Sequence, residues 1–229
     1  MPVALITGAS QGLGRALAMR LARDRWDLVI DARGAAALEA VATELRSSTR
    51  VVAVAGDVTD AGHRNALLAA ARDMGGLDAL VNNASTLGQT PLPALRDYHL
   101  DILRRVFEVN VVAPLALLQE SLPLLGPAGG RVLNITSDAA VEAYEGWGGY
   151  GAAKAALEHV SRVLSVEQPG LRVYWVDPGD MNTRMHQEAF PGEDISDRPP
   201  PEDSVPGLLR LLSGDLPSGR YSARDVVQS

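Results

Sequence analysis

Two side chains near the middle of the chain have the chemistry and the spacing to exchange a proton with a substrate. Tyr150 and Lys154 are four residues apart in an alanine-rich stretch with helical spacing, so we expect them on the same face of a helix. A free tyrosine has a pKa near ~10, and an ammonium ion about 4 Å away stabilises the phenolate by ~4 kcal/mol, or roughly 3 pKa units. We therefore expect Lys154 to lower the pKa of Tyr150 toward neutrality.

The use of lysine in this chain supports a special role for Lys154. It is the only lysine in the sequence, and the other basic side chains are arginines. A compact ammonium fits where the planar fork of arginine does not. The plainer alternative is that Tyr150 packs its ring and Lys154 is a solvated charge, because such pairs are common on helices.

A glycine-rich loop follows the first expected strand. Residues 3–6 form an apolar run, residues 15–22 have helical spacing, and the segment between them reads Thr-Gly-Ala-Ser-Gln-Gly-Leu-Gly. A strand, a glycine loop and a helix together present free backbone N–H groups to a pyrophosphate. The sequence therefore predicts a dinucleotide site that includes Gly8, Ser10, Gln11, Gly12, Leu13 and Gly14.

The same loop also fits Gly-x-Ser-x-Gly, the nucleophile turn of α/β hydrolases, with Ser10 as the nucleophile. That turn needs an upstream loop to build an oxyanion hole, and only nine residues precede Ser10. The strand–loop–helix context therefore favours nucleotide binding over hydrolysis.

Strand and helix patterns alternate along the whole chain, and its 229 residues suit one domain. We expect an α/β fold: a single doubly wound, Rossmann-like parallel sheet of about seven strands with helices on both faces. Ligands then bind at the carboxyl ends of the strands. The expected strands are 3–6, 27–31, 51–55, 77–81, 131–136, 171–176 and 219–223.

Two further segments carry specific expectations. Residues 98–125 form a long helical stretch that we expect to break near Pro114, with Asn110 inside an apolar run. A buried amide there is costly unless it is fully hydrogen-bonded. Residues 184–202 are rich in proline and irregular, so we expect a lid or substrate loop.

Composition argues against several classes of function. The net charge of −7 disfavours a nucleic-acid or anionic-membrane surface. The absence of cysteine fits a cytoplasmic location, and no apolar run approaches the ~20 residues of a membrane span. The four histidines lack helical metal-ligand spacing, so we expect no metal site.

Several motifs occur together in an order that resembles the short-chain dehydrogenase/reductase family, over about residues 3–183. They are the glycine loop, Asp57-Val58, Asn82-Asn83-Ala84, Asn110, Ser137, Tyr150, Lys154 and Pro178-Gly179. The resemblance implies that Asn110, Ser137, Tyr150 and Lys154 are catalytic. It adds as cofactor-binding residues Asp57, Val58, Asn83, Ala84, Pro178, Gly179, Met181 and Thr183, together with Tyr150 and Lys154.

The resemblance also implies a role for each catalytic residue. Tyr150 protonates a carbonyl oxygen, or accepts the proton in reverse, while Ser137 holds that oxygen. Lys154 lowers the pKa of Tyr150 and binds the nicotinamide ribose, and Asn110 anchors a water. One departure is Ser85, which stands where the family usually has glycine.

The choice between NAD and NADP depends on the residues at the end of the second strand, Asp31-Ala32-Arg33. An acid facing the ribose selects NAD, and an arginine accommodates the 2′-phosphate of NADP, but the register that decides between them is open at this point. In the family's register Arg33 takes the phosphate position, so the resemblance favours NADP(H), although Gln11 stands where a second basic residue is common.

We therefore predict an NADP(H)-dependent oxidoreductase that transfers a hydride between the nicotinamide and a small carbonyl or alcohol substrate. The alternative from a different class is a dinucleotide-binding sensor or scaffold without chemistry, because a fold does not determine a function. The family also implies a homodimer or homotetramer.

Overall fold

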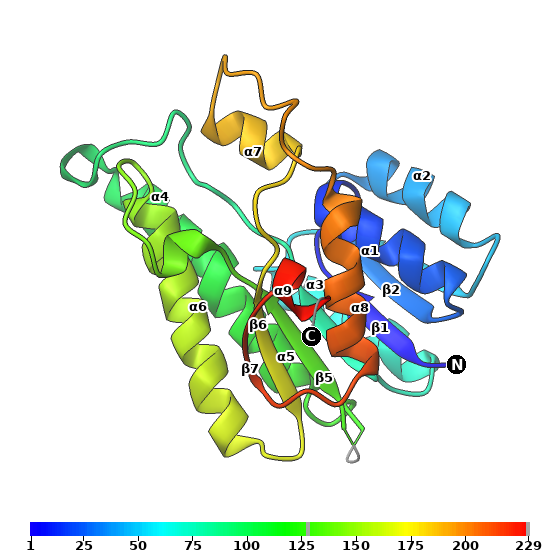
Figure 1. Ribbon diagram of the computed structural model, residues 1–229. Helices are drawn as coiled ribbons and strands as arrows, with labels where there is room; N and C mark the ends of the chain where they lie inside the picture. The colour runs from blue at the N-terminus through cyan, green and yellow to red at the C-terminus, as the bar shows by residue number, and fades with distance from the viewer. Residues whose placement is uncertain (127–128, 228–229) are drawn as a thin grey trace.

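A seven-stranded parallel sheet forms the centre of the computed structural model, which describes residues 1–126 and 129–227 (Figure 1). The strand order is β3-β2-β1-β4-β5-β6-β7, and every neighbouring pair is parallel. This confirms the predicted fold class. The strands are β1 (Val3–Ile6), β2 (Asp27–Ala32), β3 (Val51–Ala55), β4 (Ala79–Asn82), β5 (Arg131–Ile135), β6 (Arg172–Asp177) and β7 (Gly219–Ser222).

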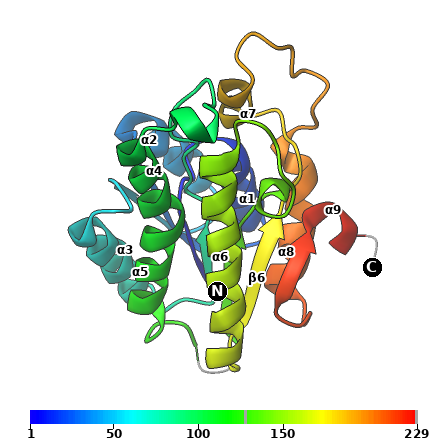
Figure 2. The same cartoon turned by 90° about the vertical axis from the view of Figure 1, so that its left-hand side faces the viewer.

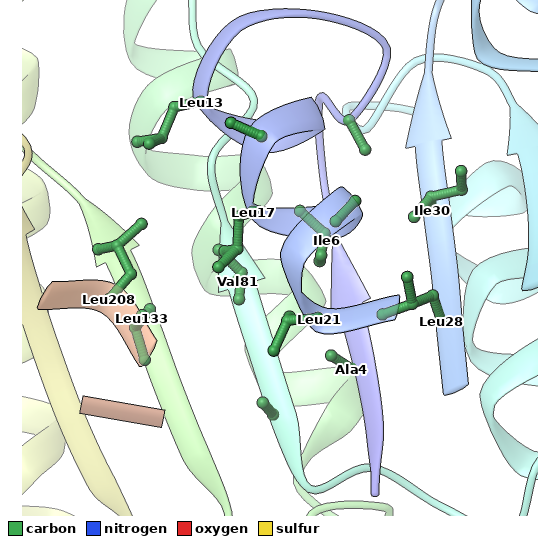
Figure 3. Close-up of a cluster of buried hydrophobic side chains, with 14 of the residues drawn as sticks. Ala4, Ile6, Leu13, Leu17, Leu21, Leu28, Ile30, Val81, Leu133 and Leu208 are labelled. Carbon is green, nitrogen blue, oxygen red and sulfur yellow. The ribbon is translucent and has the colours of Figure 1, made fainter. Parts of the chain in front are cut away.

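Helices cover both faces of this sheet (Figures 1 and 2). Alternate residues of β1 point to opposite faces, as a pleated strand requires. Ala4 and Ile6 pack with α1 (Gly12–Arg23), α2 (Ala35–Leu45) and α8 (Val205–Ser213), and part of this cluster is drawn in Figure 3. Val3 and Leu5 pack on the other face, against α3 (Ala61–Asp73), α5 (Ala113–Ser121) and α6 (Gly148–Glu167).

The strand order reverses between β1 and β4. From β1 the chain builds outward through β2 and β3, then crosses to β4 and builds through β5 to β7 on the other side. Loops that leave the carboxyl ends of β1 and β4 therefore diverge and leave a crevice between them, where open α/β sheets bind their ligands.

The helical stretch before β5 breaks near Pro114, as predicted. The regular helix α4 (Leu100–Phe107) ends at a π-helical turn, Glu108–Val112. Pro114 follows this turn and lies in the first turn of α5, where its missing N–H costs nothing. The interruption itself is the wider turn, which contains Asn110.

The segment 184–202 is more regular than predicted. Thr183 begins the short helix α7 (Arg184–Ala189) by accepting a hydrogen bond at its Oγ1 from the N–H of His186, at 3.3 Å. A 3₁₀ turn, Pro201–Ser204, leads into α8. Figure 1 shows α7 above the carboxyl ends of the strands, and the short helix α9 (Ala223–Val226) near the carboxyl terminus was also unexpected. Within the described ranges, no helix is long and apolar enough to cross a membrane.

Candidate active site

Two cavities open side by side at the carboxyl edge of the sheet. The larger has a volume of about 750 Å³ and lies over β1, β2 and β3, and the smaller has about 420 Å³ and lies under α7. They share six lining residues: Thr136, Tyr150, Pro178, Met181, Thr183 and Met185. Tyr150 therefore lies where two ligands in these cavities would meet.

The glycine loop lines the larger cavity as a main-chain surface. Gly8 has a φ of +68°, a conformation that side chains disfavour. A Cβ on Gly14 would lie 2.5 Å from the Gly8 oxygen and from Asn83 Nδ2, so only glycine lets α1 pack this closely on the loop. Gln11, which precedes α1, makes no side-chain cap. The first N–H groups of α1 are left for an anionic ligand, as a dinucleotide requires.

Side chains behind this loop hold its shape. The carboxylate of Asp31 accepts a hydrogen bond from the Gly8 N–H at 2.7 Å and contacts His63 Nε2 at 2.9 Å. Asn83 Nδ2 donates to the carbonyl of Thr7 at 2.8 Å. The supporting role of Asp31 was not predicted, although an acidic residue at the end of an apolar strand was a usable signal.

The register of β2 separates the three residues that bear on the choice of cofactor. Asp31 is 1% exposed and turned toward Gly8, so its carboxylate is already used. Ala32 is buried and pairs with Ala55. Arg33 follows the strand, is exposed and lines the larger cavity, and no ion pair of Arg33 occurs among the residues the structure describes.

The structure places Tyr150 and Lys154 on one face of α6. The Lys154 ammonium lies 5.4 Å from the centre of the Tyr150 ring and donates a hydrogen bond to the Ile135 carbonyl at 2.8 Å. Both residues are buried, and Lys154 is only 2% exposed. Both side chains line the larger cavity.

The electrostatics of this pair differ from the expectation. Burial raises the pKa of Tyr150 well above its usual value; the nearby Ser85 hydroxyl lowers it, and the charges of Asp177 and Asp138 raise it further. Burial also lowers the pKa of Lys154 to about 7. Because each group loses hydration, each favours its neutral form. Tyr150 is therefore a protonated acid at neutral pH in this structure, and the predicted lowering of its pKa by Lys154 is not observed.

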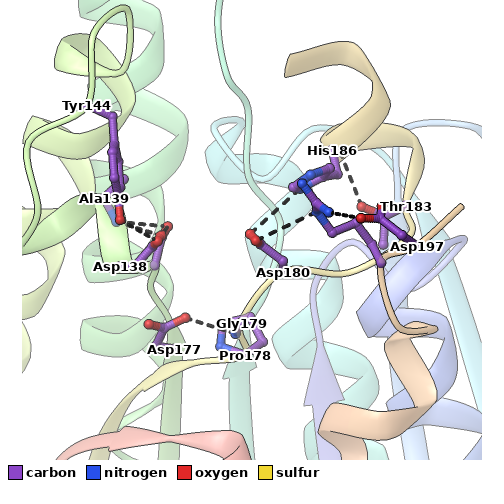
Figure 4. A network of polar contacts seen from close by, with 12 residues as sticks. Asp138, Ala139, Tyr144, Asp177, Pro178, Gly179, Asp180, Thr183, His186 and Asp197 are labelled. Atoms are coloured by element: carbon purple, nitrogen blue, oxygen red, sulfur yellow. Dashed lines mark hydrogen bonds and ion pairs between the residues drawn. The ribbon is translucent and has the colours of Figure 1, made fainter. Parts of the chain in front are cut away.

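The Ser137 hydroxyl faces Asp138, its neighbour in sequence. It donates to Asp138 Oδ1 at 2.8 Å and accepts from the Ala139 N–H at 3.2 Å. Tyr144 donates to the other carboxylate oxygen of Asp138 at 3.0 Å, as Figure 4 shows. Ser137 lines the smaller cavity, but its proton is already engaged, so holding a substrate oxygen would require this hydroxyl to turn.

The side chain of Asn110 is used by the loop that follows β4. Asn110 is fully buried, and its Oδ1 accepts hydrogen bonds from the Thr86 N–H at 2.9 Å and from Ser85 Oγ at 3.2 Å. Its Nδ2 donates to the Thr86 carbonyl at 2.9 Å. These bonds offset the cost of the buried amide. Its predicted role as the anchor of a water stays a prediction.

An arginine from β7 reaches the catalytic loop from the far edge of the sheet. Arg220 donates to Glu158 at 3.0 Å and to the Ser137 carbonyl at 3.3 Å, and it lies 3.5 Å from Asp177. The buried Glu158 also accepts from the Thr136 hydroxyl at 2.8 Å. Arg220 was not predicted, because its partners Ser137 and Glu158 are 83 and 62 residues away in sequence and no local motif surrounds it.

Aromatic and acidic side chains line the smaller cavity. Trp147 packs edge-on against Tyr150 with ring centres 5.6 Å apart, and it lies 5.9 Å from Phe190. Asp180, in the same lining, forms a long ion pair with Arg198 at 3.8 Å and lies 3.9 Å from His186 Nδ1 (Figure 4).

The predicted site residues divide among three places. Those that line the larger cavity are Gly8, Ser10, Gln11, Gly12, Leu13, Arg33, Asp57, Val58, Asn83, Ala84, Tyr150, Lys154, Pro178, Met181 and Thr183. Ser137 and Gly179 line the smaller one. Gly14 and Asn110 lie behind these surfaces and support them. In the part of the chain that the structure describes, no group of three or more histidines or acids could hold a metal ion.

Comparisons with known proteins agree with this geometry. Residues 2–194 match the family model of the short chain dehydrogenases. Mouse sepiapterin reductase is 35% identical over 202 residues, which cover 82% of this chain and 77% of that protein. A benzil reductase of Saccharomyces cerevisiae is 32% identical over 195 residues, covering 81% and 74%. A Shigella flexneri protein assigned to the short chain dehydrogenases, solved with NADP, is 28% identical, covers 97% of both chains and has a TM-score of 0.88.

Proposed function

Because this chain belongs to the family of short-chain dehydrogenases, which are NAD(P)-dependent oxidoreductases, we propose that it reduces a ketone or aldehyde with NADPH, or oxidises the alcohol in reverse. The observation that carries this proposal is the position of Tyr150, which borders both the larger cavity, lined by the glycine loop, and the smaller one. A proton donor between two such cavities suits a reaction that adds hydride and proton to one carbonyl group.

Each residue of the crevice has a separate proposed role in the reaction. When bound, the reduced nicotinamide supplies the hydride. Tyr150 gives its phenolic proton to the carbonyl oxygen, and its raised pKa keeps that proton available at neutral pH. Lys154, beside the ring of Tyr150, supplies positive charge near the phenolate that forms. Ser137 reaches the oxygen after turning from Asp138.

Arg33 supports the proposed preference for NADPH. It is exposed, lines the larger cavity and follows a strand whose acid, Asp31, is already bound to Gly8. A guanidinium in this position suits a 2′-phosphate. The relative from Shigella flexneri was solved with NADP, which is consistent with this proposal.

The smaller cavity supports a neutral substrate with a ring next to the carbonyl group. Trp147 and Phe190 offer flat apolar surfaces, and the acids Asp138, Asp177 and Asp180 outnumber the one arginine of the lining, Arg198, which disfavours a carboxylate or a phosphate. Two relatives are named for the reduction of sepiapterin and of benzil. Glu142 and Glu145, in the same loop as Trp147, do not border this cavity.

The test of this proposal is the oxidation of NADPH, followed by absorbance, in the presence of a panel of aromatic and aliphatic ketones and aldehydes. Tyr150→Phe removes the proton and should lower kcat by about 10²–10⁴-fold, while NADPH binding, measured by fluorescence, stays within twofold. NADPH binding without turnover of any compound would favour the alternative, a dinucleotide sensor. Ser10 lies in the cofactor loop, and membership of an oxidoreductase family argues against the hydrolase alternative.

We also propose that the protein is a cytoplasmic homo-oligomer that pairs through α4 and α6. Leu100 on α4 and Val163 and Val166 on α6 are exposed, with Val166 at 78%. Exposed apolar side chains on two neighbouring helices suit a subunit interface. Sedimentation velocity tests this proposal, and a protein that stays monomeric at all concentrations would contradict it.

A further inference from the structure

Arg220 extends from the edge of the sheet to three groups around the active-site loop. It lies on β7, the last strand of the sheet, and pairs in register with Trp175 of β6. Its Nε donates to Glu158 at 3.0 Å, while its Nη2 donates to the Ser137 carbonyl at 3.3 Å and lies 3.5 Å from Asp177. One planar guanidinium therefore joins α6 to the segments at the carboxyl ends of β5 and β6.

The guanidinium is itself held in place by Glu158. This residue lies on α6, one helical turn after Lys154, and its side chain is 7% exposed. Its carboxylate also accepts a hydrogen bond from the Thr136 hydroxyl at 2.8 Å. A buried carboxylate is tolerated only when it is paired and hydrogen-bonded, so the position of Glu158 determines where Arg220 lies.

The main chain of Ser137 is fixed on both sides of the residue. Its carbonyl accepts from Arg220 and also from the Ala140 N–H, at 3.1 Å. On the preceding side, the Thr136 N–H donates to the Val176 carbonyl at 2.8 Å. Rotation about the Cα–Cβ bond of Ser137 is then the movement that is left to its hydroxyl.

That rotation has to bring the hydroxyl to a defined point. The Ser137 hydroxyl donates to Asp138 Oδ1 at 2.8 Å, and in the proposed reaction it turns to the substrate oxygen beside Tyr150. A displacement of about 1 Å in a reacting group can lower a rate roughly hundredfold. The point that the hydroxyl reaches depends on where the main chain of Ser137 is held.

We propose that Arg220 is a positioning residue, which holds the main chain of Ser137 so that the turned hydroxyl reaches the substrate oxygen. Arg220 lines neither of the two cavities, so it acts through Ser137 and touches no ligand. This inference rests on the proposed function and adds a residue to it.

The test is a double-mutant cycle of Arg220→Lys with Ser137→Ala, measured as kcat with NADPH and the best ketone or aldehyde of the panel. Arg220→Lys keeps a charge beside Glu158, but one ammonium nitrogen cannot occupy the places of both Nε and Nη2. We expect kcat to fall about tenfold while the Kd for NADPH stays within twofold. In the Ser137→Ala protein, which has no hydroxyl to position, the same change should lower kcat by less than about twofold.

The matched control is Arg172→Lys. Arg172 is the first residue of β6, and its Nη2 donates to Asp215 at 2.9 Å. This change disturbs another arginine pair near the same edge of the sheet, but Arg172 lines neither cavity and lies at the opposite end of the strand from Asp177. Its kcat should stay within about twofold of the wild type, and its effect should be the same with and without the Ser137 hydroxyl.

The outcomes separate this role from a purely structural one. Equal losses from Arg220→Lys with and without the Ser137 hydroxyl would mean that Arg220 does not act through Ser137, and the inference would fail. It would also fail if Arg220→Lys lowered the melting temperature or the NADPH affinity but left kcat unchanged, or if Arg172→Lys lowered kcat as much. These results in an active enzyme would leave the proposed function standing, whereas a wild-type protein inactive on every compound would overturn both.

Discussion

The two halves of the crevice recognise their ligands by different means. The cofactor side is a main-chain surface, with Gly8 and the start of α1 held from behind by the buried side chains of Asp31 and Asn83. The other side is a set of side chains on two long loops, and within one of them Asp180 lies 3.8 Å from Arg198 and 3.9 Å from His186. A surface made by the backbone tolerates little change, whereas side chains on loops can be exchanged without disturbing the sheet.

Gly14→Ala tests the rigidity of the cofactor side and should have the largest effect. The new Cβ would lie 2.5 Å from the Gly8 oxygen, which is main chain and cannot move alone. We expect a loss of about 3 kcal/mol in the free energy of unfolding and weaker binding of both NADPH and NADH. Urea unfolding and fluorescence titration measure these. The matched control is Gly126→Ala, where the new Cβ meets nothing within 4 Å; equal effects at both positions would contradict the comparison.

Arg33→Ala tests the one place on the cofactor side where we expect a side chain to determine whether NADPH or NADH binds more tightly. A charge-assisted hydrogen bond contributes about 2 kcal/mol, so the Kd for NADPH should rise roughly thirtyfold while the Kd for NADH stays within twofold. The control is Arg23→Ala, an exposed arginine at the end of α1 that does not border the cavity. Equal losses for both cofactors would remove Arg33 from the phosphate site.

The pKa of Lys154, at the boundary between the two halves, can be tested by the pH dependence of stability. The pKa of Lys154 is lowered from 10.5 to about 7 by burial, so between these values the unfolded chain binds more protons than the folded one. The free energy of unfolding should therefore increase as pH rises above about 7. Between pH 7 and 9 the wild type should gain about 1–2 kcal/mol relative to Lys154→Met, measured by urea unfolding. Parallel curves for the two proteins would mean that Lys154 stays charged.

Trp147→Ala tests the substrate side, where we expect the smallest effect on the protein itself. The ring packs against Tyr150 and Phe190, and such contacts contribute about 1 kcal/mol. The KM of an aromatic ketone should rise about fivefold, while the KM of a small aliphatic ketone and the Kd for NADPH stay unchanged. An equal rise for both ketones would place Trp147 outside the recognition of the ring.

The cofactor side could be predicted closely from the sequence, because its signals are local. The apolar run of β1, the glycine loop and α1 follow one another directly, and β1 and β3 have the predicted limits. The glycines are informative because each is required by a local backbone conformation or a close contact that a side chain would prevent. The register of β2, which turns Asp31 inward and leaves Arg33 at the cavity, required the pairing with its neighbours.

The sequence predicted that Tyr150 and Lys154 lie together, but it did not predict their electrostatics. The spacing of Tyr150 and Lys154 placed them together, but the pKa of each depends on burial, which is a property of the packed molecule. The hydroxyl of Ser137 points to its neighbour Asp138, to which it donates a hydrogen bond. A sequence does not show the orientation of a hydroxyl group that can rotate. The π-helical turn at Asn110 likewise depends on the loop it binds, 24 residues earlier in the chain.

The contacts of Arg220 have a consequence for the part of the chain beyond α8. A strand on the outer edge of a sheet is often the easiest to remove, yet β7 sends one guanidinium inward to the carbonyl group of Ser137 and to the carboxylate of Glu158. Shortening the chain before β7 would leave that carboxylate without its counter-charge, on the same helix as Tyr150. Catalysis should then fail before the rest of the sheet unravels.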